Sequence, residues 1–147
     1  MTRKLETVGD IAVKKVAKDT IEVAWGIEIQ DLYEKLYYVD WYAHAKGRPC
    51  FMEFKARDCK RSDYKTLILS AHKYMRLCEY VQRLQANSLM VVWWNDELAY
   101  YPVDPCADVD ILWGGRKDRK DVGSDCEPVV HLPVDEFKTI KLGAYTP

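Results

Sequence analysis

Three residues in the middle of the chain, Asp40, Glu53 and Lys55, have types and a spacing suited to metal-assisted chemistry. On a β-strand, Glu53 and Lys55 project from one face because they are two positions apart, while Phe54 points to the other face. If the strand that carries Asp40 pairs with this strand, two carboxylates and an ammonium group crowd one spot. Two such carboxylates repel each other unless a divalent cation is bound between them. The pattern therefore predicts a cation site at Asp40 and Glu53.

The surrounding residues predict the two strands that must position this group. Aromatic and β-branched residues are prominent in residues 37–43 and in residues 50–58. Between these segments, Lys46-Gly47-Arg48-Pro49 has the composition of a turn. We therefore expect a hairpin that folds the second strand back on the first and places Asp40 beside Glu53.

A helix is predicted after the hairpin, from Ser70 to about Gln85, with residues 67–70 leading into it. Ser70 is a suitable N-cap, and Leu69 before it can pack back onto the helix. The apolar residues of the helix recur at helical spacing and form one stripe that should pack on the sheet: Tyr74, Leu77, Cys78, Val81 and Leu84.

The N-terminal part of the chain predicts another helix and then a strand. Residues 3–18 favour a helix because apolar residues recur three and four positions apart, at Leu5, Val8, Ala12 and Val16. Residues 21–25 alternate as a strand does. Residues 26–35 fit either a turn or a bulged strand, and the sequence leaves both open.

The second half of the chain predicts further strands. Residues 89–94 form a near-continuous apolar run suited to an interior strand. Residues 98–103 predict a neighbouring strand, and Pro102 places it at an edge. Residues 104–127 read as a glycine-containing, charged excursion, and residues 128–140 as a short strand followed by a turn or helix that covers an edge.

Asp40 and Glu53-Phe54-Lys55, with a helix after them, resemble the signature of the PD-(D/E)xK nuclease superfamily. In this chain Val39 stands at the position where the motif has proline. The resemblance implies an α/β fold with a restriction endonuclease-like core, a mixed central sheet with flanking helices in the order α-β-β-β-α-β. It covers about residues 3–103, roughly two thirds of a single domain of 147 residues. Residues 104–147 are then a C-terminal extension.

The resemblance also implies a metal site. Asp40, Glu53 and the main-chain carbonyl of Phe54 would hold Mg²⁺, a hard cation that prefers oxygen ligands, with Mn²⁺ as its substitute. In several families of the superfamily an acid on an N-terminal helix reaches the metal, and Glu6 is the candidate here. Alternatively, Glu6 is a solvent-facing acid that the helix dipole favours near the N-terminus.

Two lysines would join Asp40 and Glu53 in catalysis. Lys55 would orient or deprotonate the attacking water and counter the charge of the transition state. Related phage and archaeal proteins place a polar residue three positions after the serine that begins the helix, and Lys73 holds that place. Lys73 would touch the scissile phosphate, unless it is a solvated helix lysine. His72 beside it is either a general base or a surface histidine.

Basic residues gather in three places although the formal net charge is −1. Local basic patches attract phosphates even on a nearly neutral protein, whereas each cluster could also be an ordinary solvated surface. The clusters are Lys14, Lys15 and Lys18; Arg57, Lys60, Arg61 and Lys65; and Arg116, Lys117, Arg119 and Lys120. Among them we expect DNA contacts from Arg57, Lys60, Arg61, Arg116, Lys117 and Arg119.

The function that these expectations imply is a Mg²⁺-dependent DNA endonuclease. By analogy with Holliday-junction resolvases and phage endonucleases, it would select DNA structure and act as a homodimer. Two alternatives stay open. One is a non-catalytic nucleic-acid-binding or assembly subunit with the same fold, and the other is an unrelated α/β domain that binds a protein through its aromatic surface.

The composition of the chain argues against a membrane protein, a disulfide framework and a zinc site. No apolar run approaches the length of a membrane span, and no apolar signal segment follows the first residues, so we expect no membrane partner and a location in the cytoplasm of a bacterial or phage-infected cell. The five cysteines are an odd number without a Cys-x-x-Cys pair, which favours reduced thiols. A zinc site from Cys106, Cys126 and His131 has no supporting spacing.

Overall fold

The computed structural model describes residues 8–114 and 126–141 of the chain. Within them the elements follow one another as α1 Val8–Trp25, β1 Ile29–Asp31, α2 Glu34–Tyr37, β2 Trp41–Ala45, β3 Arg48–Ala56, the 3-10 turn η1 Arg61–Asp63, β4 Thr66–Ser70, α3 Ala71–Leu84, β5 Asn87–Trp93, β6 Leu98–Pro102, β7 Asp110–Gly114, β8 Glu127–Pro133, the 3-10 turn η2 Val134–Glu136, and β9 Lys138–Thr139. None of the helices in these ranges is long and apolar enough to cross a membrane.

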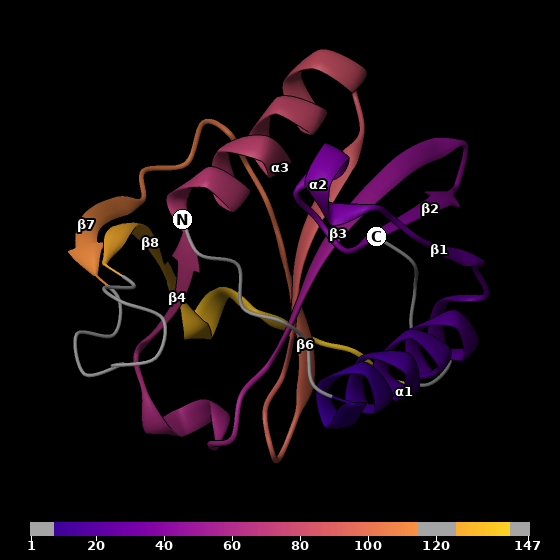
Figure 1. The fold of residues 1–147 in the computed structure, drawn as a ribbon, viewed down its shortest axis with the longest axis horizontal. Coiled ribbons are helices and arrows are strands. Elements are labelled where there is room, and N and C mark those ends of the chain that lie inside the picture. Colours follow the sequence, from indigo (N-terminus) through magenta and orange to yellow (C-terminus); the bar gives the residue numbers. More distant parts are fainter. Residues whose placement is uncertain (1–7, 115–125, 142–147) are drawn as a thin grey trace.

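A mixed sheet of six strands forms the centre of the fold, in the order β1-β2-β3-β5-β6-β9. Only β3 and β5 are parallel, and every other neighbouring pair is antiparallel. The connection between β3 and β5 passes through β4 and α3, as parallel neighbours require a crossover. In Figure 1 the strands β3 and β6 run through the middle of the molecule, with α3 above and α1 at the lower right.

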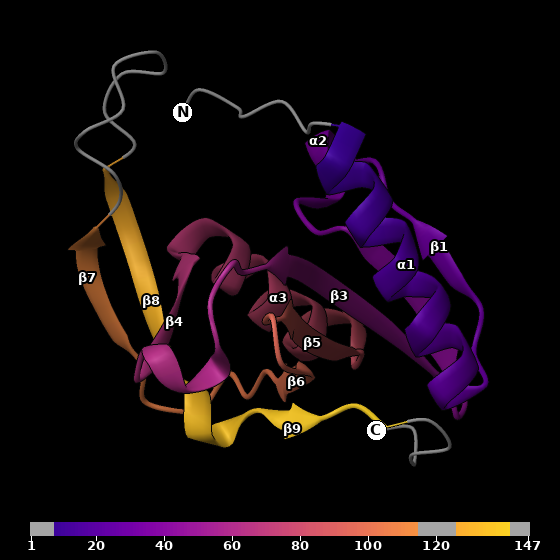
Figure 2. The same cartoon turned by 90° about the horizontal axis from the view of Figure 1, so that it is seen from below.

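Helices α1 and α3 pack against different sides of this sheet. The core around α1 contains Ile21 and Ala24 together with Met52 and Phe54 of β3. The core around α3 contains Leu77 with Phe51 of β3, whose side chain points the other way. In Figure 2, α1 lies beside β3, and β1 is seen on the other side of the helix, toward the edge of the molecule. The central strand β3 is therefore covered on both faces.

A second sheet of three strands, in the order β4-β8-β7, joins the α3 side of the core. Its inward residues, which include Leu69 and Val130, are buried in the same cluster as α3. From β8 the chain continues through η2 to β9, which pairs with β6 at Ala99 and Tyr100. In both Figure 1 and Figure 2 the small sheet lies at the opposite end of the molecule from α1.

The order α-β-β-β-α-β of the central elements confirms the predicted architecture, with α2 and the small-sheet strand β4 inserted into it. The hairpin β2–β3 and the interior position of β5 were predicted correctly: residues 89–92 are at most 1% exposed. The C-terminal segment also covers a sheet edge, because β9 pairs with β6. Helix α3 begins at Ala71 after Ser70 and ends at Leu84, close to the predicted limits.

The predicted strand at residues 21–25 is wrong, because α1 continues to Trp25. The buried residues Ala17, Ile21 and Ala24 are four and three positions apart, whereas Val23 is 73% exposed. Burial of this helical stripe against β3 outweighs the preference of β-branched residues for strands. The stripe predicted at residues 3–18 is also wrong in its described part, since Ala12 and Val16 are exposed.

The first strand of the hairpin, β2, is shorter than the strand predicted over residues 37–43. Residues 34–37 form the one-turn helix α2, Tyr38 has a positive φ, and β2 begins only at Trp41. The turn of the hairpin is also tighter, because only Lys46 and Gly47 lie outside the strands. Their φ values of 52° and 76° are those of a two-residue hairpin turn that matches the twist of the strands.

Two strands belong to segments that the sequence did not assign to a sheet. Residues 66–70 pair with β8 as β4, although residues 67–70 were expected only to lead into the helix. Residues 110–114, within the expected excursion, pair with β8 as β7. Both pairings join residues distant in the chain, so the local pattern carries little information about them.

Truncation of Ile21 should separate the observed helix from the predicted strand. We expect Ile21→Ala to lower the free energy of unfolding by roughly 2–4 kcal/mol, because the side chain is fully buried. Val23→Ala should change it by less than about 0.5 kcal/mol. A strand would place both residues on one face, so equal losses in urea unfolding would contradict the helix.

Candidate active site

Asp40 lies immediately before β2, in register with Glu53 of β3, because Trp41 pairs with Met52. The backbone N–H of Asp40 donates to the carbonyl of Met52 at 3.1 Å. Beyond this backbone hydrogen bond the pairing continues through the side chain of Asp40, whose Oδ2 accepts a hydrogen bond from the N–H of Phe54 at 2.8 Å. The carboxylate thus extends the backbone pairing along β3 and is held at one position beside it.

Contacts with α3 hold the residues that precede Asp40. The hydroxyl of Tyr80 donates to the carbonyl of Tyr37 at 2.8 Å. The guanidinium of Arg76 lies over the ring of Tyr38, 4.7 Å from its centroid. Val39 is fully buried in the α3 core. These contacts fix the segment that leads into Asp40.

Glu53 is 1% exposed, an exceptional environment for a carboxylate. Its Oε1 accepts a hydrogen bond from Lys73 Nζ of α3 at 2.6 Å. Its Oε2 is buried and has no hydrogen-bond partner among the described residues. A buried oxygen without a partner is costly in a folded protein, and such groups often mark a site for an ion or water.

The pKa of Glu53 is raised to about 8, chiefly by burial and also by the neighbouring charge of Asp40, against the lowering effect of Lys73 and Lys55. The carboxyl group therefore holds its proton to a much higher pH than an exposed glutamate. A divalent cation beside it would favour the ionised form.

Lys55 projects from β3 on the same side as Glu53 and is partly buried. Burial lowers its pKa, and the positive charges of Lys73 and Arg57 lower it further, while Glu53 and Asp40 act in the opposite direction. A lysine with a lowered pKa gives up its proton more readily than an exposed one. The charges that act on Lys55 show that Asp40, Glu53 and Lys73 share its surroundings.

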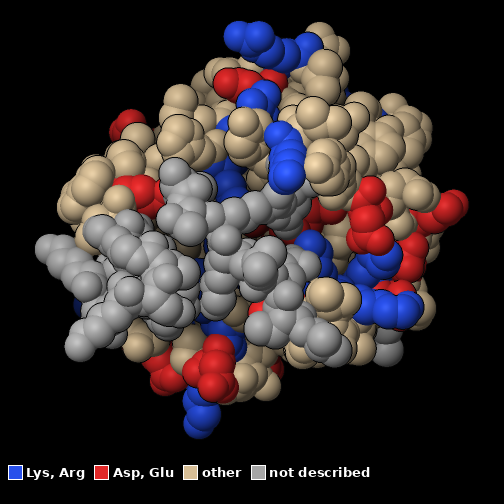
Figure 3. Space-filling view, viewed as in Figure 1, with Lys and Arg blue, Asp and Glu red and all other residues tan. Residues whose placement is uncertain are grey.

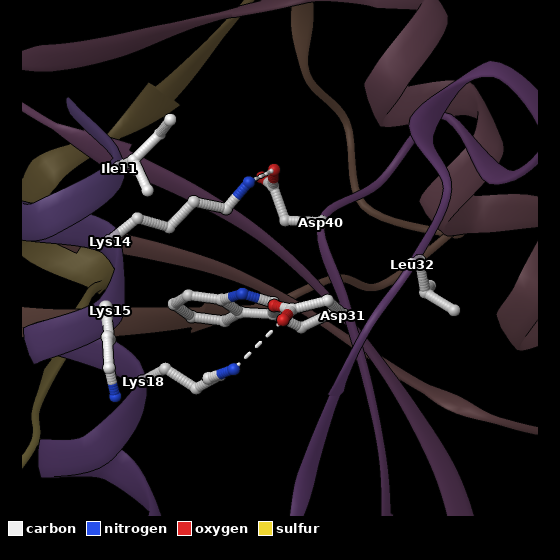
Figure 4. A pocket seen from close by; sticks show the side chains of 8 residues that line it. Ile11, Lys14, Lys15, Lys18, Asp31, Leu32 and Asp40 are labelled. Atoms are coloured by element: carbon white, nitrogen blue, oxygen red, sulfur yellow. Dashed lines mark hydrogen bonds and ion pairs between the residues drawn. The ribbon is translucent and has the colours of Figure 1, made fainter. Parts of the chain in front are cut away.

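Lys14 of α1 is a site residue that the sequence analysis missed. Its Nζ lies 2.5 Å from Asp40 Oδ1, and only 20% of its side chain is exposed. Figure 4 shows the side chain reaching from the helix to the carboxylate. Lys14 lies three positions before Ala17 on the buried stripe of α1, so the correct stripe would have pointed to it.

A cleft of about 490 Å³ opens beside this ion pair, between α1 and the segment from β1 to β2. Figure 4 shows the lysines of α1 on one side of the cleft and the acids on the other. Lys18 pairs with Asp31 across it at 3.0 Å. The residues lining the cleft are Ile11, Lys14, Lys15, Lys18, Asp31, Leu32, Asp40 and Trp41.

The residues present fit a hard cation in one respect, the unpartnered Oε2 of Glu53 beside the carboxylate of Asp40. With the carbonyl of Phe54, they would supply three oxygens of the kind that Mg²⁺ prefers. Residues 8–114 and 126–141 hold no group of three or more Asp, Glu, His or Cys side chains placed for a metal. The proposed third carboxylate, Glu6, lies outside the described residues.

Arg61, predicted to contact DNA, is engaged within the protein. Its guanidinium donates to the carbonyls of Val134 at 2.9 Å and Phe137 at 2.5 Å. It also forms an ion pair with Glu97 at 3.0 Å. These contacts attach η1 to the C-terminal segment, so nothing in the surroundings of Arg61 supports a role in DNA binding.

The other predicted DNA contacts are less constrained or lie outside the described residues. Lys60 is exposed, and Arg57 is partly buried, with a 3.4 Å hydrogen bond to the carbonyl of Ile68. On the face seen in Figure 3, basic side chains form separate groups interleaved with acidic ones. Three further predicted contacts lie outside the described ranges: Arg116, Lys117 and Arg119.

His72 and the cysteines add nothing to this site. His72 is exposed on α3, next to Lys73 in sequence. The five cysteines form no disulfide bond, and Cys50 is buried. Burial raises the pKa of the Cys50 thiol to about 12, which makes it unreactive at neutral pH.

The profile of a family described as "Phage putative PDDEXK endonuclease" matches residues 1–140. Among solved structures, the chain is similar to Hjc, a Holliday junction resolvase from the archaeal hyperthermophile Archaeoglobus fulgidus, with a TM-score of 0.55 and 11% identity over 88% of this chain and 96% of that one.

A second structure, of a protein called SSO0001, is 16% identical over 69% of this chain and 52% of that one, with a TM-score of 0.40. The likeness to the resolvase shows a common fold. No curated protein matches the chain.

The raised pKa of Glu53 makes stability depend on pH. Below about pH 4.5 the side chain is protonated in both states, and between 4.5 and about 8 only the unfolded chain loses the proton, so stability falls as pH rises. In metal-free buffer, we expect wild type to lose stability relative to Glu53→Gln between pH 5.5 and 8, by about tenfold in the unfolding equilibrium constant per pH unit.

Urea unfolding at several pH values measures this difference. The matched variant Glu28→Gln, at an exposed position, should show no such trend against wild type. Parallel pH profiles of wild type and Glu53→Gln would contradict the environment assigned to Glu53.

Proposed function

The chain belongs to the phage PDDEXK endonuclease family, whose profile covers residues 1–140, and on this basis we propose that it hydrolyses phosphodiester bonds of DNA in a reaction that depends on Mg²⁺. The observation that carries the proposal is the convergence of Asp40 and Glu53 at the start of β2, with an unpartnered oxygen on Glu53. Two carboxylates brought together in a buried setting favour binding of a divalent cation.

The proposed metal ligands are Asp40, Glu53 and the carbonyl of Phe54, with Glu6 as a further candidate. When bound, Mg²⁺ would neutralise negative charge on the scissile phosphate and support formation of a nucleophile from water. The N–H of Phe54 holds Asp40 in place, and Lys73 holds Glu53, so neither ligand has to be ordered when the cation binds.

Lys55 is the proposed catalytic lysine. Its lowered pKa suits a group that orients a water molecule and accepts its proton, and its protonated form stabilises charge on the phosphate. Lys73 is the second candidate, because its ammonium group lies at the site and can contact a phosphate oxygen. In this scheme Lys55 accepts a proton from water as the water oxygen bonds to phosphorus, and the 3′ oxygen leaves with the bonding electron pair and takes a proton from solvent.

The proposed substrate is DNA of a particular structure, cut by a homodimer. The fold shared with a Holliday junction resolvase supports this preference by analogy alone. A non-catalytic DNA-binding or assembly subunit of the same fold remains the alternative, and it predicts binding without cleavage. The convergence of the acids and the family match disfavour an unrelated protein-binding domain.

Substitution of the site residues tests the catalytic assignment. We expect Asp40→Ala, Glu53→Ala and Lys55→Ala each to reduce Mg²⁺-dependent cleavage of DNA to background while the protein stays folded. Each removes a metal ligand or a proton-transfer group, and the latter alone is worth about 10²–10⁴-fold. Gel assays measure cleavage and circular dichroism checks folding. Glu28→Gln is the control, and folded variants that cut at the wild-type rate would remove the assignment.

Substrate structure is tested with a four-way junction and a linear duplex of the same sequence. We expect faster cleavage of the junction, with symmetric cuts if two subunits act together. Equal rates on both substrates would exclude the structure-selective version while leaving the endonuclease proposal intact. Binding without cleavage of any DNA in Mg²⁺ or Mn²⁺ would favour the non-catalytic alternative.

A further inference from the structure

Both oxygens of Asp40 are used in hydrogen bonds within the protein. Oδ2 accepts the N–H of Phe54, a contact fixed by the backbone of β3. Oδ1 accepts from Lys14, whose side chain comes from a different layer of the fold. A cation that binds Asp40 must therefore share the carboxylate with an ammonium group or replace it.

Glu53 differs in this respect. Lys73 pairs with one oxygen, while the other has no partner among the described residues. A cation can approach Glu53 through that oxygen without displacing Lys73. Lys14 is thus the lysine whose present position conflicts with a cation that uses both carboxylates.

We propose that Lys14 is a displaceable positioning residue, whose ammonium group takes the place of the divalent cation at Asp40 until a cation binds and moves it away. The inference rests on the proposed metal-dependent function. A divalent ion at Asp40 would repel the ammonium group over a few ångströms, strongly so because Asp40 is only 5% exposed. The same ion would supply the charge that Lys14 supplies without it.

The structure also provides a place for the displaced side chain. The cleft beside the ion pair is open to solvent and is lined by Lys14 itself. The long, flexible lysine side chain can rotate into it without moving α1, which Ala17 and Ile21 anchor in the core. Displacement therefore requires a change of rotamer and leaves the helix in place.

The neighbouring residue Lys15 provides a matched control. It lies on the same helix and lines the same cleft, but its 71% exposed side chain pairs with Asp19, 3.2 Å away. Removal of either lysine changes the net charge by the same amount. Only removal of Lys14 takes a competing cation from a proposed metal ligand.

Mn²⁺ binding to the metal-free protein tests the inference by isothermal titration calorimetry without DNA. We expect Lys14→Met to bind Mn²⁺ about tenfold more tightly than wild type, and Lys15→Met to bind it as wild type does. In chelator, Lys14→Met should melt at a lower temperature than wild type, because Asp40 Oδ1 loses its ion pair with Lys14. At saturating Mn²⁺ the two should melt together.

Unchanged or weaker Mn²⁺ binding by Lys14→Met, or a melting deficit that persists in saturating Mn²⁺, would overturn the inference, since a purely structural ion pair predicts those results. If Lys14→Met does not fold, Lys14→Arg decides: its charge competes at least as well, so tighter Mn²⁺ binding would overturn the inference. Absence of Mn²⁺ binding in wild type would reject the proposed function itself, and this inference with it.

Discussion

Burial of a carboxylate in the central strand of an apolar sheet is the constraint on which the rest of the site depends. Glu53 is almost completely removed from water, and an isolated charge in that position would be strongly unfavourable. Two lysines offset this cost: Lys73 pairs with Oε1 of Glu53, and Lys55 lies on the same side of β3 as Glu53. The other oxygen has no hydrogen-bond partner among the described residues, and it is the oxygen that the proposed cation would use.

The two helices on opposite sides of the sheet share this electrostatic task. Lys14 from α1 pairs with Asp40, and Lys73 from α3 pairs with Glu53. The apolar stripe of each helix anchors it in the core, while one lysine from each helix reaches a carboxylate near the start of β2. The same packing that stabilises the fold thus determines where the ammonium groups lie, and a shift of either helix would change the charge balance of the site.

Local pattern was sufficient for the centre of the site. The two-residue period placed Glu53 and Lys55 on one face, and the turn composition at Gly47 predicted the hairpin that aligns Asp40. The same two-residue period misled at residues 21–25, where Ile21 and Val23 alternate but lie in a helix. There the burial of one helical stripe decided the structure, and local preference did not.

What the sequence could not provide are contacts between distant segments. The pair of Lys14 and Asp40 spans 26 positions, and the small sheet joins β4 to β8 across about sixty positions. The pairing of β9 with β6 is another contact between distant segments, and it involves only Lys138 and Thr139 of β9. Because β9 is made after every other strand, the hydrogen-bonding edge of β6 stays open during translation until this segment docks, and the nascent chain must avoid edge-to-edge aggregation until then.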